Sequence, residues 1–401
     1  MSIDLTDPDL LRDPFAVYSR LREETELTRG IIPGVPSVWL ATRYDDVKLV
    51  MSDPRFVNDA ANVPGLDAPN LIEQIWLSVG IPAEYLVYLL TGMGDSDGAN
   101  HARLRKLVTR AFTAKRVAEL RPRIKEITER LLDELPDDDT VDLLAHFAYP
   151  LPISVICELV GIPEADRPRW RAWSAVLARG MGPDMGDALR GMIDHATELI
   201  DLRRTTPTGD LLSDLVRAQD DDRLSDVELV TLVLNLVVAG HETTAHLIAN
   251  GTAALLTHPD QLTLLRNDSS LLPRAVQELM RWCGPVLGTR LRYATEDVKL
   301  GETLVHKGEA VMPVLAGANY DPRAYDRPDR LDLTRDSTAH AGFGHGPHYC
   351  LGAALARQEG EIAFEALLRR FPHLTLAVDP ADLERSPNLG TWQLAELPVR
   401  L

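Results

Sequence analysis

The 401-residue chain contains only three cysteines, Cys157, Cys283 and Cys350. An odd and sparse set of cysteines describes neither a disulfide framework nor a four-ligand zinc site. Cys157 and Cys283 stand among apolar residues with helical spacing, so we expect both to be small residues of the core. Any special role for a cysteine therefore falls to Cys350.

Basic residues are also in short supply, with 42 Lys and Arg against 60 Asp and Glu and a formal net charge of −18. This balance argues against nucleic acid or an anionic membrane as the main partner. The most apolar stretch, residues 229–240, is interrupted by Thr231 and Asn235 and is shorter than the ~18 apolar residues of a membrane span. The acidic first residues lack the basic and then apolar order of a secretory signal. We therefore expect a cytoplasmic protein that binds no nucleic acid and no membrane.

The chain also lacks repeats of fixed period, low-complexity tracts and long charged tails, so one domain over residues 1–401 is the simplest division. A strand is expected at 38–42 and a helix at 44–51, and the pattern from 101 to 281 is mostly helical. Proline and glycine interrupt it near 149–152, 161–163, 180–186 and 207–209. Residues 297–313 alternate and turn at Gly301 and Gly308 as small antiparallel strands do, and a last helix follows at 351–371. We predict a mainly α protein whose antiparallel β-sheets are small and local.

A long helix begins at a Ser-x-x-Glu capping box, Ser225 to Glu228. Six of its residues share one stripe, along which the side chains become small and then present one hydroxyl: Leu232, Leu236, Ala239, Gly240, Thr243 and Leu247. A flat ligand and a small molecule could lie on this stripe. Glu242 points about 100° away from Thr243 and could feed a proton relay through water. Ordinary tight helix packing, with a solvated Glu242, is the alternative.

The same segment contains His241, Glu242 and His246, which is similar to the zinc-protease pattern of two histidines four residues apart. Here the interval is five. Five helical steps place the two imidazoles about 140° apart around the helix, so one zinc ion could not readily bind both.

The most informative segment is Phe343-Gly-His-Gly-Pro-His-Tyr-Cys-Leu-Gly352. Its glycines allow a tight loop to lie against a flat surface. The next helix begins where the loop ends, so Cys350 would lie beside free backbone N–H groups and the positive end of a helix dipole, which favour the thiolate. A redox or nucleophilic cysteine with His345 or His348 as its base could use this setting. Neither role explains the flatness, whereas a haem iron bound axially by the thiolate does.

At these residues the sequence resembles the cytochrome P-450 superfamily of haem-thiolate monooxygenases, in its soluble bacterial type. The signature Phe-Gly-x-Gly-x-His-x-Cys-x-Gly is matched at every fixed position. Further motifs follow in the order typical of the family: His101-Ala-Arg-Leu-Arg105, Ala239-Gly-His-Glu-Thr-Thr244, Glu278-Leu-Met-Arg281, and Arg330 in Arg327-Pro-Asp-Arg-Leu-Asp. The resemblance spans essentially the whole chain and looks closest to the macrolide and polyketide hydroxylases of actinomycete antibiotic pathways. It implies the cytochrome P-450 fold.

The resemblance also implies a role for each matching residue. Cys350 would be the proximal ligand of a haem b iron. Thr243 would hydrogen-bond the bound dioxygen, and Glu242 would help to deliver protons to it. Four cation-capable residues would bind the haem propionates, and three others would contact the haem or pack near the sulfur: His101, Arg105, Arg292 and His348, then Ala239, Gly240 and Phe343. Glu278 and Arg281, at i and i+3, would be buried with Arg330 and hold the core around the haem.

Electrons are expected from separate proteins, because only 51 residues follow Cys350, too few for a fused reductase. By resemblance the donors are a ferredoxin and an NAD(P)H-dependent ferredoxin reductase, and the enzyme is a monomer. Some family members use peroxide, but the Glu242–Thr243 pair matches the oxygen-dependent pattern.

Residues 101–125 hold nine Lys or Arg against one acid, Glu119. This is either a solvated helix face or the surface that docks an acidic electron carrier near the thiolate face.

In the family the substrate pocket is lined by segments that map to residues 63–93, 236–239, 286–289 and 389–392. Candidate contacts are Leu236, Val238, Ala239, Leu287, Gly288 and Trp392. Most of this lining is apolar or small, which favours a bulky, largely apolar metabolite of macrolide or polyketide type.

The expected reaction inserts one atom of dioxygen into a C–H or C=C bond. Oxidative coupling, ring formation or multi-step oxidation by the same haem, and a non-catalytic gas-binding haem protein, are the alternatives. A sensor would not need the Glu242–Thr243 pair.

Overall fold

The computed structural model describes residues 2–401 except 33–34, 67–70, 79, 179–181, 183, 221–223 and 387–389. The chain forms two compact units. The first comprises Met1–Ala68, Leu131–Ala148 and His246–Leu401, and the second comprises Pro69–Arg130 and Tyr149–Ala245. Both units are built from separated segments, so the division does not cut the chain into consecutive domains. The single domain over 1–401 stays a prediction.

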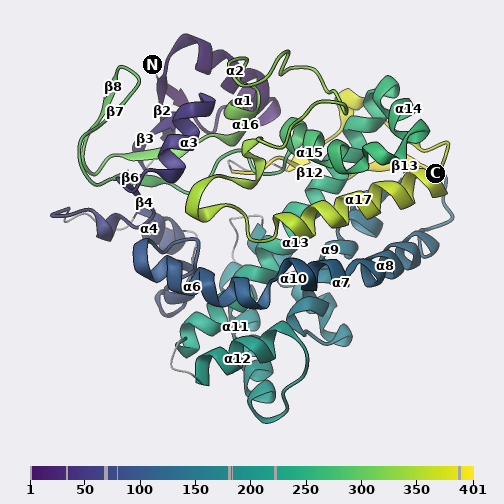
Figure 1. Ribbon diagram of the computed structural model, residues 1–401, viewed down its shortest axis with the longest axis horizontal. Coiled ribbons are helices and arrows are strands. Elements are labelled where there is room, and N and C mark those ends of the chain that lie inside the picture. Colours follow the sequence, from purple (N-terminus) through teal and green to yellow (C-terminus); the bar gives the residue numbers. More distant parts are fainter. Residues whose placement is uncertain are drawn as a thin grey trace. The chain divides into compact units, whose positions relative to one another are not determined.

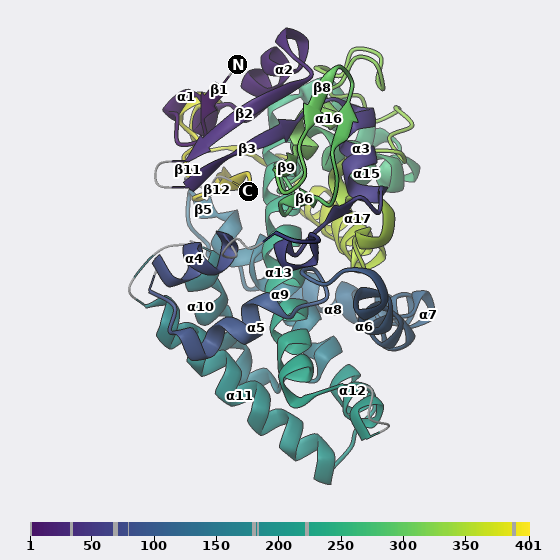
Figure 2. The same ribbon diagram turned by 90° about the vertical axis from the view of Figure 1, so that its left-hand side faces the viewer.

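The first unit contains a six-stranded mixed sheet (Figure 2). Its strands, in spatial order, are β1 (Ser2–Asp4), β2 (Leu27–Ile32), β3 (Val35–Ala41), β9 (Ala310–Pro313), β6 (Arg292–Ala294) and β4 (Phe56–Val57). β1 runs parallel to β2 and β3 runs parallel to β9, with Trp39 opposite Val311. The strand predicted at 38–42 is thus confirmed as part of β3. The sheet is not purely local, because it joins segments about 270 residues apart.

The predicted turns at Gly301 and Gly308 are confirmed. β7 (Val298–Leu300) and β8 (Thr303–Val305) form a hairpin around Gly301, whose φ is +56°, and Gly308, with φ +83°, precedes β9. Two small sheets complete the β structure. One contains β10 (Thr375–Leu376), β13 (Pro398–Arg400) and β5 (Val141–Asp142), and the other pairs β11 (Arg385–Ser386) with β12 (Gln393–Leu394).

Helices surround the sheets of the first unit. They are α1 (Pro8–Arg12), α2 (Pro14–Glu24), α3 (Tyr44–Ser52), α14 (Pro259–Asn267), α15 (Leu272–Cys283), α16 (Leu315–Asn319) and α17 (Ala353–Arg370). α3 and α17 confirm the helices predicted at 44–51 and 351–371. α15 packs against α17, and the two lie side by side in Figure 1.

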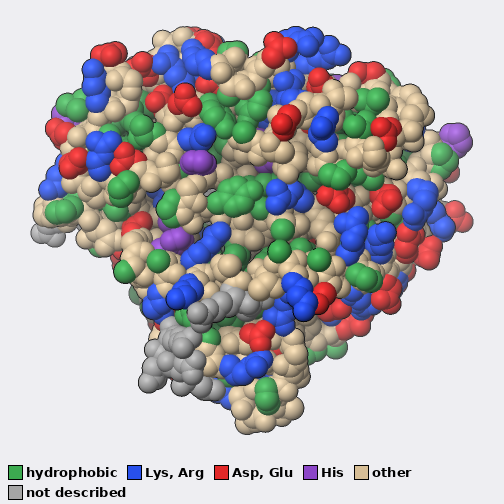
Figure 3. All heavy atoms as spheres, viewed as in Figure 1, with side chains coloured by type: hydrophobic (Ala, Val, Ile, Leu, Met, Phe, Trp, Pro, Cys, Tyr) green, Lys and Arg blue, Asp and Glu red, His purple; other side chains and the backbone are tan. Residues whose placement is uncertain are grey.

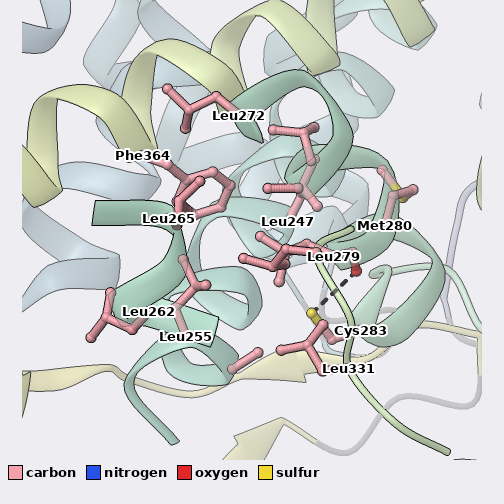
Figure 4. Close-up of a cluster of buried hydrophobic side chains, with 14 of the residues drawn as sticks. Leu247, Leu255, Leu262, Leu265, Leu272, Leu279, Met280, Cys283, Leu331 and Phe364 are labelled. Atoms are coloured by element: carbon pink, nitrogen blue, oxygen red, sulfur yellow. Dashed lines mark hydrogen bonds between the residues drawn. The ribbon is translucent and has the colours of Figure 1, made fainter. Parts of the chain in front are cut away.

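Apolar side chains between α15, α17 and the end of α13 form the core shown in Figure 4. Leu279 and Phe364 are fully buried there. Gly251 allows the close approach, because a Cβ at that position would lie 2.6 Å from Cζ of Phe364. The Cys283 thiol donates to the Leu279 carbonyl at 3.3 Å, and burial raises its pKa to about 12. Cys283 is therefore a core residue, as predicted.

The second unit is helical in the part that the structure describes. It contains α4 (Leu71–Ser78), α5 (Leu86–Leu90), α6 (Gly98–Ala111), α7 (Ala114–Glu119), most of α8 (Arg121–Asp133), α9 (Pro150–Val160), α10 (Arg167–Ala178), α11 (Met185–Thr205) and α12 (Leu211–Asp220). α11 packs against α10 and α12 (Figure 2). Cys157 is fully buried in α9, and burial raises the pKa of its thiol to about 12, which confirms it as a core residue.

The longest helix, α13 (Asp226–Thr257), begins at the predicted capping box. The Ser225 N–H donates to Oε2 of Glu228 at 2.8 Å, and the Glu228 N–H donates to Oγ of Ser225 at 3.2 Å. By length and composition alone α13 could cross a membrane, but 67% of its most apolar window is buried inside the structure. This burial is what the core helix of a globular protein shows.

Candidate functional site

The segment that contains Cys350 is a closed loop in the first unit. Two 3₁₀ turns, η6 (Ala341–Phe343) and η7 (Gly346–His348), precede the cysteine, and α17 begins three residues after it. The Cys350 N–H donates to the Phe343 carbonyl at 2.8 Å, which closes the loop. The Cys350 side chain is exposed, whereas the other two cysteines are buried. The predicted ligand is thus the accessible thiol, held at the start of a helix.

Two of the three loop glycines are required by their backbone. Gly344 and Gly346 have φ of +75° and +70°, where side chains are disfavoured. A Cβ on Gly346 would also lie 2.8 Å from the Met51 carbonyl oxygen at the end of α3. Gly352 has φ −81° and no such constraint. The glycine at 346 therefore lets the loop lie against α3, a packing reason that the sequence pattern did not reveal.

His340 anchors the start of the loop and was not singled out from the sequence. Its Nδ1 accepts from the Gly342 N–H at 2.9 Å, so the proton lies on Nε2, which donates to Oε1 of Gln277 at 2.8 Å. Burial, reinforced by Arg357 and Arg281, lowers the pKa of His340 to about 3. The imidazole is therefore neutral, and it ties the loop to α15.

Three further predicted residues also lie in the first unit. Phe343 is 7% exposed, and its ring packs against His340 and Tyr349. His348 has its Nε2 2.9 Å from Nδ2 of Asn58. Arg292 is buried in β6. The contacts of His348 and Arg292 with propionates stay predictions.

The predicted Glu278–Arg281 pair is fully buried and doubly hydrogen-bonded, with N···O distances of 2.8 and 2.7 Å. The assignment of Arg330 as the third member is wrong. Arg330 is exposed, and only its backbone carbonyl takes part, accepting from Arg281 at 3.3 Å. The side chain that completes the network is that of Arg335, whose Nε donates to Oε1 of Glu278 at 3.2 Å. Ser337 also donates to Glu278, so this carboxylate binds three side chains.

In the second unit, the predicted stripe on α13 is partly open to solvent. Ala239 is exposed, and Leu236, Val238 and Thr243 are partly exposed, in a helix that is otherwise mostly buried. The Thr243 hydroxyl donates to the Ala239 carbonyl at 2.8 Å. Because that bond uses the only proton of the hydroxyl, its remaining lone pairs can accept hydrogen bonds on the open stripe.

Gly240 faces another helix of the same unit. A Cβ at Gly240 would lie 2.9 Å from Cγ1 of Ile156, so this glycine lets α9 pack closely against α13. For Gly240 the packing interpretation is therefore sufficient. Its contact with haem stays a prediction.

Glu242 is 6% exposed, so the alternative of a solvated Glu242 is wrong. The Tyr149 hydroxyl, from the residue before α9, donates to Oε2, and Nε2 of His241 lies 3.1 Å from Oε1. Tyr149 was not predicted, because nothing in the sequence connects it to a residue 93 positions away. Two other predicted residues of this unit, His101 and Arg105, lie in α6, the first buried and the second half-buried.

The remaining predicted substrate contacts lie in the core of the first unit. Leu287 and Trp392 are 5% and 9% exposed and belong to one apolar cluster. The Trp392 ring packs under the Arg385 guanidinium at 3.5 Å, and Gly288 faces Met312. Position 389 lies outside the described residues. Substrate contact by these three residues stays a prediction.

The basic segment 101–125 is partly neutralised within its own unit. Arg103 pairs with Glu228, Arg116 with Asp214, and Arg123 with Glu158. Three lysines on it are exposed: Lys106, Lys125 and Lys115, whose Nζ lies 3.8 Å from Oε1 of Glu119. Across the face in Figure 3, cationic and anionic side chains are interspersed. The local excess of positive charge is smaller than the sequence count indicates.

These features fit a haem bound through sulfur. The loop presents one accessible thiol at a helix start, the ligand type that binds haem iron in thiolate enzymes. The small residues of the α13 stripe leave an open surface beside a hydroxyl and a buried carboxylate. Within the first unit, Arg292 and His348 are side chains suited to bind carboxylate groups.

Comparison with known proteins identifies the family. The sequence model of the cytochrome P-450 family matches residues 173–395. Cytochrome P-450 107B1 and 6-deoxyerythronolide B hydroxylase, both from Saccharopolyspora erythraea, are 44% and 42% identical, over 98% and 99% of each chain. The tirandamycin C-bound P-450 monooxygenase TamI has a TM-score of 0.91 and 42% identity, over 100% of both chains. The chain therefore belongs to the cytochrome P-450 family and is a haem-thiolate monooxygenase with the fold of that family.

Proposed function

We propose that this enzyme inserts one atom of dioxygen into a C–H or C=C bond of a bulky, largely apolar metabolite of macrolide or polyketide type. The single observation that carries the proposal is the accessible Cys350 thiol in a loop that matches the family signature at every fixed position. The substrate class is supported by two proteins that are 42% identical to this chain, 6-deoxyerythronolide B hydroxylase and the tirandamycin C-bound monooxygenase TamI. The open, small-residue stripe of α13 also suits an apolar ligand.

We propose that residues 1–401 act as one domain of a monomeric, cytoplasmic enzyme. The relatives cover 98% or more of the chain, and the family match at 173–395 includes segments of both compact units. Both observations support one catalytic domain.

Cys350 would hold the iron of haem b, and the haem propionates would bind His101, Arg105, Arg292 and His348. The bound haem supplies the activation of dioxygen. The protein's contribution is to position groups and to handle protons. Glu242, buried and held by Tyr149, would exchange a proton at Oε1 or Oε2. The Thr243 hydroxyl, whose own proton is donated to Ala239, would accept a hydrogen bond from the water that carries this proton.

Cytochrome P-450 enzymes use redox partners and small-molecule substrates. For this chain the proposed donors are a separate ferredoxin and its NAD(P)H-dependent reductase. The exposed Lys106, Lys115 and Lys125 would attract an acidic ferredoxin and raise its encounter rate. Reversing all three charges to Glu should slow haem reduction by ferredoxin and weaken its dependence on salt. A rate of reduction that is insensitive to both changes contradicts this docking surface.

Two spectroscopic and kinetic measurements test the proposed chemistry. The reduced, carbon monoxide-treated protein should absorb at the position typical of thiolate ligation, and Cys350→Ala should lose this band. Thr243→Ala should divert reducing equivalents to hydrogen peroxide and lower the amount of product formed per NAD(P)H. The matched control is Thr244→Ala, because Thr244 makes the same type of bond, to Gly240, and is buried at 3% exposure. Full coupling in Thr243→Ala would contradict the assigned role.

The substrate class is tested by titrating the ferric enzyme with a panel of metabolites. Macrolides and linear polyketides should shift the haem spectrum, whereas compact charged acids of similar concentration should not. Tight binding of only the charged compounds would refute the proposed substrate class.

A further inference from the structure

Three side chains of the second unit meet at the acid of α13. The Tyr149 hydroxyl donates to Oε2 of Glu242, and Nε2 of His241 lies 3.1 Å from Oε1. The rings of Tyr149 and His241 meet edge to face, with centroids 5.8 Å apart. Each carboxylate oxygen of Glu242 thus has a polar neighbour of its own.

The three side chains differ in their access to water. His241 is 0% exposed and Glu242 is 6% exposed, whereas Tyr149 is half-buried. Burying a carboxylate is costly unless donors satisfy it. A phenol O–H that points at Oε2 meets part of this requirement, and it also fixes the side-chain rotamer of the acid. Tyr149 is therefore placed to orient Glu242.

The position of Tyr149 is itself fixed by packing. It directly precedes α9, whose first residues include Pro150 and Pro152. α9 approaches α13 closely because Gly240 has no Cβ to meet Ile156. The orienting phenol therefore directly precedes α9 and the acid lies in α13, and the close contact of these two helices lies two residues before Glu242. The guanidinium carbon of Arg171, from α10, lies 5.8 Å from the Tyr149 ring centroid and places a positive charge near the phenol.

His241 presents a specific nitrogen to the acid. Its Nδ1 lies 2.9 Å from the Val237 carbonyl oxygen, and a carbonyl only accepts, so Nδ1 carries a hydrogen. In a neutral imidazole Nε2 would then be a lone pair, 3.1 Å from a carboxylate oxygen. The two atoms lie close together, but their geometry is not that of a hydrogen bond.

We propose that Tyr149 is a positioning residue for Glu242: the Tyr149 hydroxyl fixes Oε2 and thereby the side-chain rotamer of the acid. The proposal rests on the proposed function, because it gives Glu242 a role in proton delivery. In each transfer the proton leaves Glu242 for a water on the Thr243 side, and solvent returns one proton to Glu242. Tyr149 keeps its own proton and acts only through Glu242.

The first test reads the hydrogen bond without using activity. 3-Fluorotyrosine is incorporated at position 149 by amber suppression, and the ¹⁹F resonance is recorded in the reduced, carbon monoxide-bound holoenzyme. Glu242→Gln should shift this resonance. The same label at Tyr44, whose hydroxyl donates to the Ala339 carbonyl at 2.7 Å, is the matched control and should not respond. An unchanged resonance at 149 would overturn the contact.

The second test compares Tyr149→Phe with Glu242→Gln in turnover. We expect Tyr149→Phe to keep its haem content, substrate KM and rate of haem reduction, and to release several-fold more hydrogen peroxide per NAD(P)H. It should also show a larger solvent deuterium isotope effect on product formation. Tyr44→Phe should leave all of these values unchanged. A purely structural role for Tyr149 would lower haem content and stability without a change in the isotope effect.

The outcomes separate the inference from the proposed function. If Glu242→Gln remains fully coupled, the role of the acid fails, and the inference fails with it. If Glu242→Gln is uncoupled but Tyr149→Phe is not, and the fluorine resonance does not respond, only the positioning role is overturned. Should Tyr149→Phe fail to fold, the labelled protein, which retains a phenol at 149, still decides whether Glu242 is its partner.

Discussion

At the scale of single residues, the loop that carries Cys350 depends on Gly346. Its left-handed backbone and the short distance to the Met51 carbonyl both exclude a side chain. An alanine would have to adopt φ near +70° and also displace the end of α3. The two penalties act on the same segment that presents the thiol.

We predict that Gly346→Ala lowers the free energy of unfolding by at least about 1–2 kcal/mol, the cost of the left-handed conformation alone. Urea unfolding followed by circular dichroism measures this, and haem content should fall in parallel. The control is Gly209→Ala, where a Cβ would meet no atom within 4 Å. It should change stability by no more than about 0.5–1 kcal/mol. Equal stability of both variants would show that the loop tolerates a side chain at 346.

Sequence spacing predicted Cys350, Glu242 and Thr243, because their motifs are local. It did not predict Tyr149 or His340, whose partners stand 93 and 63 residues away. Such pairs depend on how helices pack, and no short window of sequence records that packing. The same limit explains why Arg330, which matches the family motif, was preferred to Arg335.

At the scale of elements, the buried Glu278 network ties α15 to the segment that follows α16. Arg281 donates to the carbonyls of Asn319 and Pro328 at 2.9 and 2.8 Å, and Arg335 contributes a second guanidinium. A buried carboxylate with charged donors is stable only while the donors remain. The network therefore fixes the course of this irregular segment.

Arg335→Ala should cost about 1.5–3 kcal/mol, because it removes hydrogen bonds to a buried charge. Arg330→Ala should change the free energy of unfolding by no more than about 0.5 kcal/mol, since only its backbone takes part. Chemical unfolding of the two variants, side by side, measures the difference. A larger loss for Arg330→Ala would restore Arg330 as the third member.

The helices were largely predictable, since capping boxes, glycine stops and apolar periodicity are local signals. Ser225 and Glu228 make both predicted bonds of their box. The strands β1, β2, β4, β5, β6 and β10 to β13 were missed. All of them except β2 have only two or three residues, too few for an alternating pattern, and the partners of β4 and β5 lie far along the chain.

At the scale of the whole molecule, two buried histidines contribute to the loss of stability in acid. The Trp170 indole N–H donates to Nδ1 of His195 at 2.7 Å, and burial lowers the pKa of His195. His340 is held neutral by a comparable arrangement, with its pKa lowered from 6.5 to about 3. At these two side chains the unfolded chain therefore binds more protons than the folded protein below pH 6.5. The stability that they contribute is present above 6.5 and falls as the pH drops from 6.5 towards 3.

For His340 alone this loss should reach about 2 kcal/mol at pH 5 relative to pH 7. His340→Asn keeps an acceptor for the Gly342 N–H and cannot be protonated. The variant should therefore lose about 2 kcal/mol less than the parent protein over the same interval, as measured by urea unfolding at both pH values. Identical losses would show that His340 becomes charged without opening the loop.

The pairing of β3 with β9 sets an order of events during synthesis. Trp39 and its hydrogen-bond partner Glu309 are separated by 270 residues, so the first three strands leave the ribosome long before their neighbour exists. At bacterial translation speeds the delay is roughly 15–50 seconds. During that time the edge of β3 offers unpaired N–H and C=O groups to any other strand. The yield of soluble enzyme on overexpression should therefore depend on chaperones that cover the nascent amino-terminal strands.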